Sequence, residues 1–156
     1  MDERAVRDQL LALLRGGQAY ITAEDALDRV PLERVNETPK GFPHSAWQLL
    51  EHLRICQWDI LEYIRNPGHE SPSWPEGYWP DPNDEATPAR WKGAVKQFKS
   101  ELTDLKRLVD DSRVDLTAPM PHTPGHSVLR EILIVADHNA YHLGQLVQLC
   151  RVLDVW

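Results

Sequence analysis

The sequence predicts an all-α protein, a four-helix bundle formed by a single domain over residues 1–156. Apolar residues recur at intervals of three and four in four long segments, which is the spacing of one face of a helix. Gly- and Pro-rich stretches separate these segments, and no segment has a convincing strand pattern. At 156 residues the chain is long enough to bury a core without disulfides or metal ions.

The first 43 residues predict one long helix and one short helix. Apolar positions at helical spacing place the first over about residues 2–15, and a Gly-Gly pair ends it. Thr22 and Asp25 form a capping box for the short helix that follows. We expect residues 32–43 to form an irregular connection.

The second long helix begins at Ser45, which forms a capping box with Gln48, and its apolar pattern continues to Ile64. After it, residues 67–88 carry six of the twelve prolines of the chain, and this density excludes a regular helix. The same stretch is too rich in aromatic residues for a loose linker. We therefore expect an ordered loop that packs its aromatic side chains, Trp74, Tyr78 and Trp79, onto the helices.

The third long helix begins with Thr87 as N-cap and Pro88 at its first position, and its apolar seam ends at Val109. Residues 110–125 form a second Pro-rich connection, and the last helix covers about residues 127–153. Because the middle of this last helix is apolar on almost every side, we expect it to lie centrally in the domain.

Three helical histidines are the candidate metal ligands: His52, His138 and His142. The last two are four residues apart, so their side chains lie one turn above the other on the same helix face. His52 lies at or near the inward face of the second long helix, and bundle cores bring such ligands together from facing helices. Three His ligands with an open fourth position describe a catalytic zinc site.

The spacing alone leaves two interpretations open. Seven histidines placed at random would give roughly 0.3 pairs with this spacing, so one pair is weak evidence, and the rings are equally interpretable as hydrogen-bonded core histidines. Gln145, three residues after His142, is a candidate to orient that ring, whereas Glu51 and Asp137 point about a quarter-turn away from their neighbouring histidines. Gly144 in a helix interior suggests close approach by another part of the chain.

The remaining polar and charged residues limit the compartment and the partners. Lys and Arg number 17 against 24 Asp and Glu, a net charge of −7 without a basic run, so we expect no nucleic-acid partner. No segment predicts a membrane span or a signal peptide, and we expect the two cysteines to be reduced, buried thiols in a cytoplasmic protein. The other four histidines are expected to face solvent: His44, His69, His122 and His126.

Three segments, PHSAWQLLEHLRICQWDI, SPSWPEGYWP and VADHNAYHLGQLVQLCRVLDVW, occur in this order and resemble the DinB/YfiT-like superfamily, in particular its DinB_2-type members. The resemblance covers nearly the whole chain, and its most specific part is an EHL on one helix with a distant DHNAYHLGQ. It implies a four-helix bundle of up-down-down-up connectivity and a divalent metal held by three histidines. By position, these are His52, His138 and His142.

The activity that the resemblance implies is less specific. Some relatives are thiol-dependent S-transferases, others were proposed as metal-dependent hydrolases, and many have no known reaction. We expect a metalloenzyme of one of these types, with a small-molecule substrate, in which the metal activates a thiol or a water. Zn or Ni is the expected metal, with Fe and Mn as alternatives, and a low-molecular-weight thiol is a candidate cofactor.

Two alternatives remain open at this point. One is a non-catalytic stress-response protein that binds a metal or a ligand, and a fourth protein ligand would favour it. The other is a protein without metal, whose histidines are satisfied by hydrogen bonds in the core. The apolar end of the last helix also leaves room for a homodimer.

Overall fold

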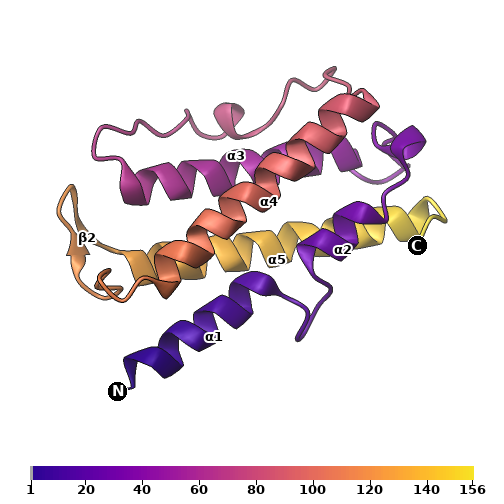
Figure 1. Ribbon diagram of the computed structural model, residues 1–156. Coiled ribbons are helices and arrows are strands. Elements are labelled where there is room, and N and C mark those ends of the chain that lie inside the picture. Colours follow the sequence, from indigo (N-terminus) through magenta and orange to yellow (C-terminus); the bar gives the residue numbers. More distant parts are fainter. Residues whose placement is uncertain (1) are drawn as a thin grey trace.

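The computed structural model describes residues 2–156 and is mainly helical (Figure 1). Its elements, in chain order, are α1 (Glu3–Arg15), α2 (Ala23–Asp28), η1 (Leu32–Arg34), α3 (Ala46–Arg65), η2 (Glu76–Tyr78), α4 (Pro88–Asp110), β1 (Pro119–Met120), β2 (Thr123–Ser127) and α5 (Val128–Val152), where η marks a 3₁₀ turn. The all-α prediction is therefore confirmed, and the four long helices lie where the sequence pattern places them.

The long helices form a bundle in which α1 and α5 run in one direction and α3 and α4 in the other (Figure 1). This is the up-down-down-up order. Helix α3 packs against both α4 and α5, and α1 packs against the same two helices. The Pro-rich connection from α3 to α4 runs back along α3, because α4 begins again at the end of the bundle where α3 began (Figure 1).

Local capping explains why the helices begin where they do. The Ser45 hydroxyl accepts a hydrogen bond from the Gln48 backbone N–H, and the Gln48 side chain accepts one from the Ser45 N–H, so the predicted capping box of α3 is complete. The hydroxyls of Thr22 and Thr87 cap α2 and α4 by accepting the backbone N–H of Asp25 and Arg90. The predicted capping box of Thr22 and Asp25 is thus only half formed, because the Asp25 carboxylate accepts the Thr22 hydroxyl and not its backbone N–H. These local bonds satisfy backbone donors that the first turn of a helix leaves without partners.

The core lies between α3, α4 and α5, and its fully buried side chains include Leu50, Leu53, Phe98 and Ile132. Helix α5 is less enclosed than we expected from its apolar middle. Leu133 is 46% exposed and the next residue, Ile134, is 38% exposed. The helix packs on α1, α2 and α3 but keeps one face open, because four helices cover one another only on their facing sides.

A short antiparallel hairpin corrects the expectation that the chain contains no strand. β1 and β2 pair Pro119 with Ser127 and Met120 with Thr123, just before α5. The sequence hides this hairpin because only Met120 on it is buried, so there is no apolar alternation, and its prolines are residues that strands usually avoid.

The Pro-rich loop is ordered, as expected, and two of its three named aromatic side chains contact the bundle. Tyr78 and Trp79 lie against α3, whereas Trp74 is 75% exposed, so the expectation for Trp74 is wrong. Trp74 contacts only the ring of Tyr78 among the aromatic side chains of residues 2–156. Across the same residues, no helix has the length and apolarity that a membrane span requires.

Candidate metal centre

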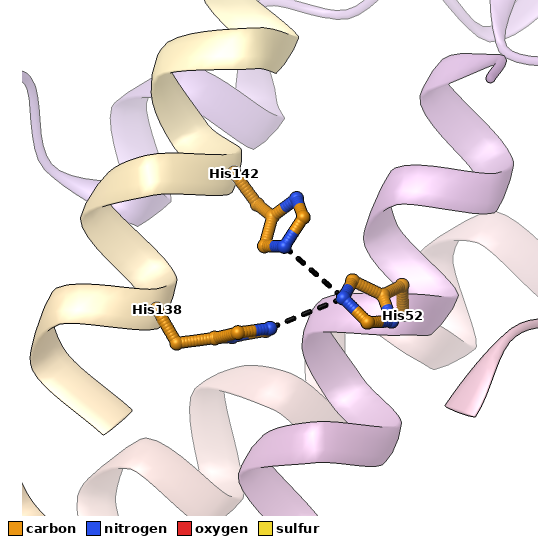
Figure 2. Close-up of side chains that lie close together, drawn as sticks. All are labelled: His52, His138 and His142. Atoms are coloured by element: carbon orange, nitrogen blue, oxygen red, sulfur yellow. Dashed lines mark hydrogen bonds between the residues drawn. The ribbon is translucent and has the colours of Figure 1, made fainter. Parts of the chain in front are cut away.

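Three imidazole rings from two helices converge in the bundle (Figure 2). His52 comes from α3, and His138 and His142 come from successive turns of α5. The Nε2 atom of His52 lies 3.1 Å from Nε2 of His142 and 3.1 Å from Nε2 of His138. One nitrogen from each ring falls in a group whose members are all within 4.8 Å of one another.

Hydrogen bonds on the far side of two rings decide where their protons lie. Nδ1 of His52 donates to the Tyr78 carbonyl oxygen at 2.7 Å, and Nδ1 of His142 donates to Oε1 of Gln145 at 2.7 Å. Because these oxygens only accept, both neutral rings carry their proton on Nδ1. Their Nε2 lone pairs then face each other across 3.1 Å, an arrangement that repels unless a cation lies between them.

His138 has no such partner, since its Nδ1 is a buried atom without a hydrogen bond. Its proton is therefore free to sit on Nε2 and bridge to Nε2 of His52, or to move to Nδ1 and leave Nε2 as a third donor. Two nitrogens each about 2.0–2.1 Å from one zinc ion lie roughly 2.9–3.4 Å apart for bond angles between octahedral and tetrahedral. The 3.1 Å separations fit this range, so the residues present suit a shared divalent ion.

Burial keeps these rings neutral, which metal ligation requires. Burial lowers the pKa of His52 and that of His138 to about 4, and it lowers the pKa of His142 in the same direction. Neighbouring rings add to the effect, because a second positive charge beside the first is unfavourable. At neutral pH all three rings are therefore uncharged, and each can offer a nitrogen lone pair to a metal ion.

Trp79 forms a wall of the cluster. Its ring stacks on His52 with centroids 3.8 Å apart and planes 3° from parallel, and on His44 with centroids 3.9 Å apart. Two rings at the same distance and nearly parallel to the indole must lie on its opposite faces, so Trp79 is held between them. The expectation that His44 faces solvent is therefore wrong, and half-buried His44 lies beside the cluster.

An acidic residue near the cluster was missed in the sequence. Asp59, 8% exposed on α3, accepts hydrogen bonds from Nε2 of His69 at 2.6 Å and from the Tyr78 hydroxyl at 2.8 Å. His52, Cys56 and Asp59 follow one another at four and three residues, so the periodicity of α3 places a carboxylate on the same inward face. This position on the inward face of α3 was the sequence signal that could have revealed Asp59.

The structure also assigns the remaining polar candidates. Glu51 pairs with Arg54 and Asp137 is exposed, so neither contacts the rings, in agreement with their quarter-turn offset. Gln145 does orient His142. The expectation that His69 faces solvent is wrong, since its side chain is only 7% exposed. His122 and His126, also expected in solvent, are half-buried and bond to the carbonyl and the hydroxyl of Tyr63.

Both cysteines are free and buried, as expected. The Sγ atom of Cys56 lies 3.6 Å from Nδ1 of His52, at the edge of the cluster. Burial raises the pKa of the Cys56 thiol to about 12, so the group stays protonated at neutral pH. Among residues 2–156 the three histidines are the group of side chains placed closely enough to hold a metal ion.

The fold and the cluster define a class of protein, a helical bundle with a buried three-histidine site between two of its helices. A family model described as the DinB superfamily matches residues 17–146, and the chain belongs to this superfamily. The match includes all three histidines and both Pro-rich connections. Searches of curated proteins and of solved structures found no match.

Proposed function

We propose that this protein is a divalent-metal-dependent enzyme of the thiol S-transferase or hydrolase type, with the metal held by His52, His138 and His142. One observation carries the proposal: the acceptors behind His52 and His142 leave two Nε2 lone pairs 3.1 Å apart, which a cation would stabilise. Zn²⁺ or Ni²⁺ suits three imidazole donors. Such an ion, when bound, lowers the pKa of a coordinated water or thiol and supplies a nucleophile at neutral pH.

The residues of the chain have defined parts in this proposal. Tyr78 and Gln145 hold two rings in the donor tautomer through their oxygens, and this orientation raises the affinity of a His site. Trp79 covers one side and excludes water there. A set of three protein ligands is also typical of catalytic zinc, which keeps its fourth position for water or substrate. An electrophile with an apolar group would pack against the exposed part of the aromatic loop.

The metal content of the purified protein tests the proposal. We expect close to one divalent ion per chain by mass spectrometry in protein purified without chelator, or after metal is added back, and none in His142→Ala. His126→Ala is the matched control, since His126 bonds to Tyr63 away from the cluster, and it should keep the ion. A wild-type protein that binds no divalent ion would contradict both the metal site and the proposed enzyme activity.

The catalytic part needs a separate measurement. Metal-loaded wild type is expected to transfer a low-molecular-weight thiol to an electrophile, or to hydrolyse an activated ester or amide, and to lose this turnover when the metal is removed. Turnover that survives complete metal removal contradicts the mechanism. A protein that binds metal but is inactive across both reaction classes would instead be a non-catalytic metal-binding protein.

A further inference from the structure

A continuous set of contacts connects the buried carboxylate of Asp59 to the ring of His52. The Asp59 carboxylate accepts a hydrogen bond from the Tyr78 hydroxyl at 2.8 Å. The backbone carbonyl oxygen of the same Tyr78 accepts a hydrogen bond from Nδ1–H of His52 at 2.7 Å. The carboxylate and the imidazole belong to one helix, α3, seven residues apart. Tyr78 spans them with its two ends and belongs to η2, in the Pro-rich loop.

Asp59 also ties the beginning of this loop to the helix. Nε2 of His69 donates to its other oxygen at 2.6 Å, so residues 69 and 78 are both attached to one carboxylate. A carboxylate that is 8% exposed is costly to bury unless donors surround it, and these two side chains are the donors. The attachment therefore holds both ends of the segment from His69 to Tyr78 on α3.

Tyr78 has the properties needed to link Asp59 to His52. Burial raises its pKa to about 12, and its bond to Asp59 acts in the same direction, so the hydroxyl keeps its proton and donates. With the hydroxyl held, the carbonyl of Tyr78 has little freedom to turn away from His52. The next residue, Trp79, stacks on the His52 ring and limits its rotation as well.

We propose that Asp59 and Tyr78 are positioning residues that hold His52 in its Nδ1–H tautomer and thereby set the metal affinity of the three-histidine cluster. The part that concerns affinity rests on the proposed metal site, whereas the tautomer is a property of the metal-free chain. Without the attachment, the Tyr78 carbonyl moves, His52 exchanges between its two tautomers, and its Nε2 is a free donor only part of the time. Partners of this kind change metal affinity by about 10–100-fold.

Tyr78→Phe is the direct test, because it keeps the aromatic ring and removes only the hydroxyl. The His52 tautomer is measured on metal-free protein by long-range ¹⁵N–¹H NMR, with the ring signals assigned by their absence in His52→Gln. We expect a single Nδ1–H form in the wild type and a mixture in the variant. Zinc affinity, measured by competition with a chromophoric chelator, should fall about 10–100-fold in Tyr78→Phe.

Tyr63→Phe is the matched control. Tyr63 lies on α3, the helix that carries His52 and Asp59, and its hydroxyl also makes a 2.8 Å hydrogen bond, in this case with Nδ1 of His126. The Tyr63→Phe variant therefore loses a tyrosine hydroxyl bond that lies away from the cluster. It should keep both the tautomer and the zinc affinity of the wild type. A general loss of stability would affect both Tyr→Phe variants alike, so the difference between them reports on the cluster.

A double variant tests whether the two residues act together. If Asp59 acts through Tyr78, adding Asp59→Asn to Tyr78→Phe lowers zinc affinity no further. Tyr78→Phe with a wild-type His52 tautomer overturns the proposal, whether or not its zinc affinity falls, and a tautomer change that leaves zinc affinity unchanged overturns the part that concerns affinity. A wild type that binds neither zinc nor any other divalent ion removes the proposed function and, with it, the part that concerns affinity, whereas the tautomers of the metal-free proteins still decide whether Asp59 and Tyr78 hold His52.

Discussion

At the scale of single residues, the three rings are largely buried, and the nitrogens that face one another include more hydrogen-bond acceptors than donors. His52 and His142 each donate one proton outward, and their inner nitrogens have no proton to share. His138 is the one ring with a proton free to move, because its Nδ1 lacks a partner. In the metal-free cluster, His138 is therefore the ring that can donate a proton to Nε2 of His52.

The pH dependence of stability tests this description. Burial lowers the pKa of His138 from 6.5 to about 4, so between these pH values the unfolded chain binds more protons than the folded one. Lowering the pH through this window should therefore reduce the free energy of unfolding of the metal-free protein, with the loss complete only below the folded-state pKa of about 4. Urea unfolding at several pH values should give a shallower dependence for His138→Gln, and equal dependence in both proteins would contradict the burial of a neutral ring.

At the scale of elements, α5 carries two of the three candidate ligands, and one partly apolar face of this helix is open. Gly144 lies within it, and we expected another part of the chain to approach there. That expectation is wrong, since a Cβ added at Gly144 would meet nothing within 4 Å. The glycine lowers the stability of a helix that otherwise fixes the spacing of His138 and His142.

Gly144→Ala should therefore stabilise the protein by about 1 kcal/mol, the difference in helix propensity between the two residues. Thermal or urea unfolding measures the change. Gly16→Ala provides the contrast, because Gly16 ends α1 at a φ of 70°, where a side chain is strained, and this variant should be less stable than the wild type. A loss of stability in Gly144→Ala would mean that the position is not open.

At the scale of the whole molecule, one buried arginine attaches the first helix to the rest of the bundle. Arg7 is 2% exposed, and its guanidinium donates to the backbone carbonyls of Val109 at 2.6 Å and Asp111 at 3.0 Å, at the end of α4. Helix α1 precedes the segment matched by the family model, yet it covers part of the core between α4 and α5. The structure makes it an integral part of the fold.

Arg7→Leu should destabilise the protein by about 2–3 kcal/mol, because the carbonyls at the end of α4 lose a charged donor in a buried setting. Arg4→Ala is the control on the same helix. Its side chain is 62% exposed, and its ion pairs with Asp8 and Asp110 contribute little to stability because solvent screens them. Equal losses in the two variants, measured by urea unfolding, would show that the buried bonds of Arg7 add nothing.

The sequence by itself determined the helices, because capping and apolar periodicity are local. Ser45 with Gln48, and Thr87 with Pro88, mark helix starts that the structure reproduces. The spacing of His138 and His142 likewise placed two rings on one helix face. The hairpin before α5 was not predictable in this way, since its strands carry prolines and bury only Met120.

Only the tertiary structure decided how the third ring meets the other two and what holds it. His52 is 86 residues from His138 along the chain, and its tautomer depends on the backbone carbonyl of Tyr78, which no residue type reveals. Asp59 acquires its partners only when the Pro-rich loop folds back along α3. These contacts join segments distant in sequence, and their geometry comes from helix packing, to which local patterns are insensitive.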